Sequence, residues 1–111
     1  MTSRRQSKAE RRFIEAVTQF VLSLGGRPGS FYDYELDTPA GLLNVSVHDN
    51  WVATRFDDVA MGRAFSEAYD RACNPYSGKW NFHFPSGYTP ELAVAELRFW
   101  FDKLMSWRPS S

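Results

Sequence analysis

The residues best placed to do chemistry are three polar side chains that alternate along one expected strand, residues 79–84. Side chains two positions apart share a strand face, so Lys79, Asn81 and His83 should form one row. The intervening positions are all aromatic, which is typical of a core: Trp80, Phe82 and Phe84. A cation, an amide and an imidazole in one row favour a binding surface. The alternative is the solvated face that half-covered antiparallel sheets commonly present.

A neighbouring expected strand, residues 51–56, extends this row into a mixed patch. Alternation puts Trp51 and Arg55 on one face of that strand, and His48 lies just before the turn that leads into it. We therefore assign Trp51 and Arg55, with Lys79, Asn81 and His83, to a candidate partner-binding surface.

Metal-ligating and nucleophilic side chains are present but not in diagnostic patterns. No pair among His48, Asp49, Cys73 and His83 has a ligand spacing such as C-x-x-C. Ser77 lies in no G-x-S-x-G turn, and its pairing with His83 rests on proximity in sequence alone. We predict no metal, cofactor or catalytic residue, and a small enzyme centred on His83 is the least favoured alternative.

Composition bounds the remaining classes of function. The chain has 111 residues, 16% of them aromatic, and a formal net charge of zero, so no global field attracts it to nucleic acid or membrane. One cysteine cannot form an internal disulfide, and no apolar run is long enough for a membrane span. The expected location is cytoplasmic, with no membrane association.

Periodicity and turn residues predict one α+β domain over residues 7–108, preceded by a flexible basic tail over 1–6. The expected helices span 7–24, 58–72 and 90–107, and the expected strands span 31–37, 42–48, 51–56 and 79–84. This order, α-β-β-β-α-β-α, indicates an antiparallel sheet with helices packed on one face. The pairing partner of the fourth strand stays open. Alanines in the second helix suggest close packing against the sheet.

Charge is unevenly distributed along the chain. Residues 31–58 hold six carboxylates against one arginine, a balance of minus five. Asp33, Glu35 and Asp37 would lie on one strand face about 6.6 Å apart, close to the spacing of phosphates on one nucleic-acid strand. This acidic row is a second candidate partner-binding surface. The alternative is that it protects an edge strand from aggregation.

The start of the chain is basic, with a balance of plus four over residues 4–12. Basic side chains on one helix can bind phosphate, and such binding weakens steeply with salt. A nucleic-acid-binding accessory protein is therefore the alternative function, and it would use five residues: Arg4, Arg5, Lys8, Arg11 and Arg12.

The last helix has more apolar side chains than one core-facing stripe can absorb. Phe99 and Trp107 lie off the best inward stripe, which is Leu97, Trp100, Phe101 and Leu104. They predict a protein interface, such as a homodimer contact. Burial of this helix on two sides is the equal alternative.

Three runs, residues 38–41, 47–60 and 74–83, resemble small uncharacterised proteins carried by bacterial phages and plasmids. The resemblance covers about residues 10–107 and transfers no functional residue. Accessory proteins of mobile elements include inhibitors of host defence, such as anti-CRISPR proteins. The leading expectation is a non-enzymatic module that binds a protein, or a nucleoprotein complex, and inhibits a host defence complex by occluding its surface.

Overall fold

The computed structural model describes residues 7–69, 71, 73–85 and 87–109. The expected basic tail, with Arg4 and Arg5, lies outside these residues. The structure confirms the predicted α+β class: three helices accompany a five-stranded antiparallel sheet, and the predicted element order holds with one additional short strand. The elements are α1 (Lys8–Ser23), β1 (Arg27–Pro28), β2 (Tyr34–Thr38), β3 (Gly41–Val47), β4 (Trp51–Phe56), α2 (Val59–Ala68), β5 (Phe82–His83) and α3 (Pro90–Ser106).

The strands lie in sequence order across the sheet, and every pair of neighbours is antiparallel. The fourth expected strand is β5, which pairs with β4 at one edge of the sheet. Its ladder covers only Phe82 and His83, and one isolated bridge joins Lys79 to Arg55. The pairing that the sequence left open is thereby settled.

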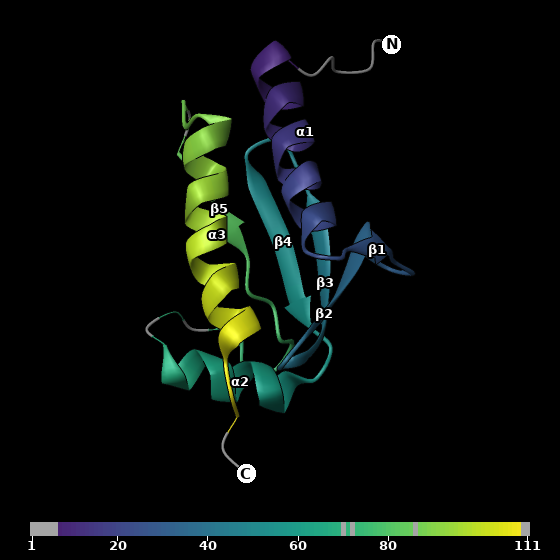
Figure 1. The fold of residues 1–111 in the computed structure, drawn as a ribbon, viewed down its shortest axis with the longest axis vertical. Helices are drawn as coiled ribbons and strands as arrows, with labels where there is room; N and C mark the ends of the chain where they lie inside the picture. Colours follow the sequence, from purple (N-terminus) through teal and green to yellow (C-terminus); the bar gives the residue numbers. More distant parts are fainter. Residues whose placement is uncertain (1–6, 70, 72, 86, 110–111) are drawn as a thin grey trace.

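Helices α1 and α3 lie side by side over one face of the sheet, and α2 crosses one end of it (Figure 1). The sheet and the helices share one aromatic-rich core. Trp80, Phe56, Phe65 and Phe101 are each at most 1% exposed and their rings contact one another. Within the described residues, no helix covers the opposite face, which we call the open sheet face.

Local sequence signals begin and end the two long helices as expected. Ser7 and Glu10 form a capping box at the start of α1, which satisfies two backbone N–H groups that have no partner within the helix. Gly25, with a φ of 95°, ends α1 in the left-handed region that favours glycine. Thr89 caps α3, and Pro90 occupies its first turn, where proline costs no backbone hydrogen bond.

The second helix differs from its prediction. Asp58 caps α2 as expected, but the helix ends at Ala68, where the next residue, Tyr69, is extended (φ −130°, ψ 150°). Residue 72, the expected end, lies outside the described residues. The expected alanine face is wrong, because Ala60, Ala64 and Ala68 are exposed. Close packing comes instead from Gly62 and Phe65, the buried residues of this helix.

The end of α3 corrects the expected homodimer contact. Phe99 is 54% exposed, as predicted, but Trp107 is 8% exposed and packs edge-on against Phe65, with ring centroids 5.7 Å apart. The backbone is extended at Trp107, and the indole packs against α2. Trp107 is therefore part of the core.

Candidate binding surface on the open sheet face

The strand register places one row of polar side chains across β1 to β4 on the open sheet face and on to Lys79, which precedes β5. Arg27 is opposite Glu35, Glu35 is opposite Asn44, and Asn44 is opposite Arg55. Arg55 in turn bridges to Lys79 at the far edge. These five residues form what we call the cross-sheet row. Two of the residues predicted for the candidate surface, Arg55 and Lys79, are thus brought together by the fold.

A stack of three rings lies on the same face, on the β4–β5 side of the sheet. Trp51 is opposite His83 in the β4–β5 ladder, and their rings are nearly parallel, with centroids 5.1 Å apart. On its other side Trp51 is stacked by His48, with centroids 4.0 Å apart and planes 9° apart. We call these three residues the ring stack. Both faces of the Trp51 indole are therefore covered by imidazoles.

The hairpin between β3 and β4 holds the ring stack in place. The hairpin Asp49–Asn50 joins β3 to β4, and the His48 N–H donates to the Trp51 carbonyl at 2.9 Å. The Phe84 N–H donates to the Asn50 carbonyl at 3.1 Å, which fixes the end of β5 beside this hairpin. The ring stack thus depends on a contact between segments more than 30 residues apart in the chain.

A second turn, residues 74–78, positions Lys79. The Asn74 side-chain oxygen accepts from the Tyr76 and Ser77 N–H groups, as expected of an Asn that stabilises its own turn. Gly78 has a φ of 77° and its carbonyl accepts from the Phe56 N–H at 2.9 Å. The Arg55 Nε donates to the Ser77 carbonyl at 2.9 Å, so the guanidinium is tied to this turn.

Asn81 departs from the predicted row. Its side-chain oxygen accepts from the Thr54 backbone N–H at 3.1 Å, and the Thr54 hydroxyl donates to the Trp80 carbonyl. The Asn81 carbonyl accepts from Arg71, whose guanidinium lies 3.7 Å from the Phe82 ring centroid. Burial lowers the pKa of Arg71 from its ordinary value. The side-chain oxygen of Asn81 thus serves the sheet, while Lys79 and His83 stay exposed on its face.

The expected acidic row is wrong as a continuous strand face. Asp33 lies in the bend before β2, where its N–H donates to the Ser46 hydroxyl. Glu35 and Asp37 do share a face, but Arg27 lies against both, 3.6 Å from Glu35 and 2.9 Å from Asp37. The hydrogen bond to Asp37 raises the pKa of Arg27, followed by the charge of Asp37. None of the expected strands includes Arg27, because a strand of two residues such as β1 is too short to leave a pattern in the sequence.

The basic start of α1 is only partly described. Lys8, Arg11 and Arg12 are exposed on the helix, and Arg12 lies 4.0 Å from Glu91 of α3. Helix α1 covers the face of the sheet opposite the ring stack, so the two candidate surfaces are separate (Figure 1).

In the part of the chain that the structure describes, the side chains considered as metal ligands or nucleophiles are not brought together. Among the described residues, no group of three or more His, Cys, Asp and Glu side chains could hold a metal ion. The Trp51 ring separates His48 from His83, so the two imidazoles do not share a ligand position. Cys73 is buried in the core, whereas His83 is exposed, so the two side chains do not form a thiol–imidazole pair of the kind that nucleophilic catalysis requires.

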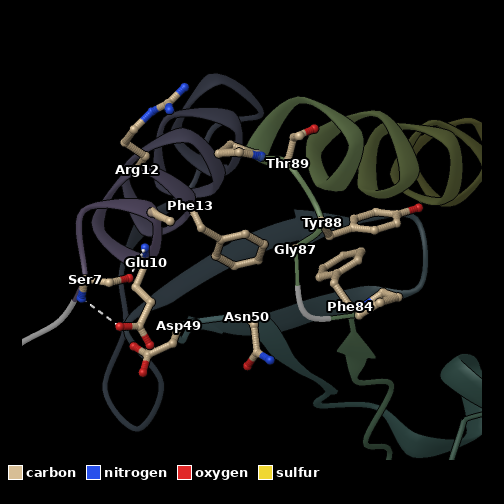
Figure 2. A pocket seen from close by; sticks show the side chains of 13 residues that line it. Ser7, Glu10, Arg12, Phe13, Asp49, Asn50, Phe84, Gly87, Tyr88 and Thr89 are labelled. Carbon is tan, nitrogen blue, oxygen red and sulfur yellow. Dashed lines mark hydrogen bonds between the residues drawn. The ribbon is translucent and has the colours of Figure 1, made fainter.

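A hollow of about 750 Å³ lies where α1 and α3 both begin, beside the Asp49–Asn50 hairpin (Figure 2). Phe13, Phe84 and Tyr88 form its aromatic wall, and polar groups from both helix starts rim it. Ser7, Glu10 and Thr89 on this rim already act in helix caps. The described contacts of the rim therefore stabilise the two helix ends.

Two exposed aromatic side chains were not anticipated. Phe31, in the loop before β2, is 95% exposed, and Tyr76, in the turn before Lys79, is 92% exposed. Phe31 was expected at the start of the strand 31–37, but β2 begins only at Tyr34, so Phe31 lies outside the sheet. Tyr76 directly precedes Ser77, whose carbonyl binds Arg55, so it borders the cross-sheet row.

The fold and this surface define a small α+β domain with one helix-covered and one open sheet face. No protein-family model matches the chain, and no curated protein and no solved structure matches it. None of the helices in the described residues combines the length and apolar character needed to cross a membrane.

Proposed function

We propose that this protein is a protein-binding module that docks its partner on the β4–β5 half of the open sheet face. The observation that carries the proposal is the gathering of Trp51, Arg55 and Tyr76 beside Lys79 and His83. Tryptophan, tyrosine and arginine are the residue types that most often dominate protein interfaces. Trp51 and Arg55 come from β4, and the strand register brings them to one face with Lys79 and His83. Tyr76 lies in the turn that leads to Lys79 and is 92% exposed.

Rigidity supports the same proposal. Arg55 is tied to the Ser77 carbonyl, and Trp51 is fixed between two imidazoles. Side chains ordered before binding lose less conformational entropy when a partner arrives. The sequence resemblance implies an inhibitor of a host defence complex, which would be one kind of protein-binding module. The proposal does not depend on this resemblance, because it rests on the open sheet face alone.

The alternative, nucleic-acid binding, has weaker support on this face. Proteins that bind single strands stack bases on open aromatic rings. Both faces of Trp51 are already covered, so the indole offers no such platform. The basic start of α1 remains the separate nucleic-acid candidate, through Lys8, Arg11 and Arg12.

Capture from native host lysate tests the proposal. The tagged protein is compared with Lys79→Glu and His83→Glu, which change exposed residues of the open sheet face, and with Gln19→Glu, an exposed position on α1. We expect the wild type and Gln19→Glu to retain the same protein, with or without nuclease. Both sheet-face variants should retain at least about fivefold less, since truncated hot-spot contacts typically cost more than 1 kcal/mol.

Two results would overturn the proposal. Equal capture by the sheet-face variants would place the contact elsewhere on the molecule. Capture that nuclease abolishes, and that Lys8→Gln with Arg11→Gln also abolishes, would replace it with nucleic-acid binding by α1. Amide spectra of each variant report whether the fold is intact.

A further inference from the structure

Charges are segregated between the two halves of the open sheet face. β4 and residues 79–84 contain no carboxylate, and they contribute Arg55, Lys79 and His83. The carboxylates of this face, Glu35 and Asp37, lie on β2 and are paired with Arg27. The half that holds the ring stack is therefore the cationic half.

Arg55 is prepared for an anionic partner. Its Nε donates to the Ser77 carbonyl, whereas no described residue accepts a hydrogen bond from its Nη atoms. A guanidinium held in this way presents its remaining N–H groups as a fork, which matches a carboxylate in shape and charge. Lys79, opposite Arg55 and exposed, adds a second cation beside it.

The ring stack adds charge that depends on pH. Histidine side chains change charge between pH 5 and 8, and a protonated imidazole over an indole face gains a cation–π attraction. The titratable groups around the ring stack are few. The hairpin contributes Asp49, β4 contributes Arg55, the segment before β5 contributes Lys79, and β3 contributes no charged side chain. A protonated imidazole at either position would add a cation to a half-face that already carries Arg55 and Lys79.

We propose that the partner docks an acidic protein segment on this half-face, and that binding strengthens as His48 and His83 become protonated. This inference rests on the proposed function and names the chemistry of the partner: aspartate and glutamate side chains opposite Arg55, Lys79 and the ring stack. A protein segment fits better than a nucleic-acid strand, because the covered faces of Trp51 leave a base no indole to stack on.

Amide chemical shifts during titration with poly-L-aspartate test the proposal on the intact chain. An oligodeoxythymidylate with the same number of charges is the comparison ligand. Carboxylates and phosphodiesters stay ionised at pH 5.5 and 7.5, so only the protein changes charge between these conditions. We expect poly-aspartate to shift residues 48–55 and 79–83. Under this proposal its affinity should be about three- to tenfold higher at pH 5.5, because interactions between solvent-accessible charges are modest, and should fall as salt is raised.

Three variants separate the contributions. His48→Gln with His83→Gln should lose the gain at pH 5.5, so that its affinities at the two pH values agree within about twofold. Lys79→Gln should weaken binding at both pH values and keep their ratio. Lys8→Gln with Arg11→Gln, on the helix-covered side, should change neither value.

Other outcomes overturn the inference. An affinity of wild type that is the same at both pH values excludes the imidazoles, and shifts confined to α1 exclude the half-face. Equal or tighter binding of the oligodeoxythymidylate at residues 48–55 and 79–83 makes the surface a nucleic-acid site. No binding of poly-aspartate, together with lysate capture that still depends on Lys79 and His83, refutes the acidic partner and leaves the docking surface intact.

Discussion

The side-chain oxygen of Asn81 lies 3.1 Å from the backbone nitrogen of Thr54 and accepts its hydrogen bond. In a regular antiparallel ladder, a strand carbonyl would take this place. Here the Trp80 carbonyl opposite accepts from the Thr54 hydroxyl instead, and Thr54 is fully buried. Asn81 therefore closes the β4–β5 ladder between its two paired regions, and it supports the ring stack without belonging to it.

Replacing Asn81 by alanine should destabilise the fold. The Asn81→Ala change leaves the buried Thr54 N–H without an acceptor, which costs about 1–3 kcal/mol. Asn81→Asp keeps an acceptor oxygen at the same position, so it should recover most of the loss. Urea unfolding of both variants measures the difference, and equal stabilities of Asn81→Ala and wild type would show that the ladder does not need this oxygen.

Replacing Gly62 by alanine should change the stability in the direction opposite to the one that helix propensity predicts. A Cβ atom at this position would lie 2.6 Å from the Phe56 ring, which is fully buried. Alanine favours an exposed helix over glycine by about 1 kcal/mol, yet overpacking a core costs about 1–3 kcal/mol. We expect Gly62→Ala to lower the free energy of unfolding.

The matched control for Gly62 is Ala64→Gly, an exposed position of the same helix. Propensity alone applies there, so this variant should be destabilised by about 1 kcal/mol. Both values come from denaturant unfolding with a common slope. A Gly62→Ala protein more stable than wild type would mean that α2 moves away from Phe56 without loss.

The sequence predicted the features that local signals encode. Ser7 with Glu10, Thr89 with Pro90, and the alternation of Trp80, Phe82 and Phe84 each follow from residues within a few positions of one another. The features it missed depend on distant partners. Arg27 is placed opposite Glu35 by a two-residue strand, and Trp107 is buried against Phe65 of α2, which is distant in the sequence.

The candidate site, too, could be predicted from the sequence only in part. Alternation placed Trp51, Arg55, Lys79 and His83 on outward positions, and the structure agrees. Stacking of His48 and His83 on the two faces of Trp51 requires the β4–β5 register, which no local pattern encodes. Asn81 has the right spacing for the row, but a hydrogen bond inside the sheet claims its oxygen.

The surroundings of Tyr88 predict that the stability of the fold depends on pH in the alkaline range. Burial raises the pKa of Tyr88, and the hydrogen bond of its hydroxyl to Glu96, at 3.2 Å, raises it further. A raised pKa in the folded state means that the contribution of Tyr88 to stability is complete below the unfolded value, about 10. It is lost as pH rises through the folded pKa.

Phenolate absorbance measures this shift directly. The difference between the titrations of wild type and Tyr88→Phe isolates Tyr88, and it should show ionisation above pH 10. Glu96→Gln removes the carboxylate charge, so the midpoint should fall but stay above that of an exposed tyrosine, since burial is the larger cause. A Tyr88 midpoint at the ordinary value would contradict the half-buried, hydrogen-bonded hydroxyl.

The acidic residues of β2 give the sharpest test of which half of the open sheet face binds. Glu35 and Asp37 are already paired with Arg27, so an added partner cation would compete with a contact that the fold supplies. We expect Asp37→Asn to leave lysate capture within about twofold of wild type. Its effect on stability should stay below about 1 kcal/mol, because exposed ion pairs contribute little.

Glu35→Lys with Asp37→Lys extends this test by reversing both charges beside Arg27. Like-charge repulsion should loosen the β1–β2 pairing, which a lower unfolding midpoint would report, while capture through Trp51, Arg55 and Lys79 persists. Loss of capture by the reversed pair, with amide spectra of β4 and β5 unchanged, would assign the contact to the acidic half instead. In that case the Lys79→Glu variant, on the cationic half, should still capture the partner. The two variants together therefore assign the partner to one half of the sheet.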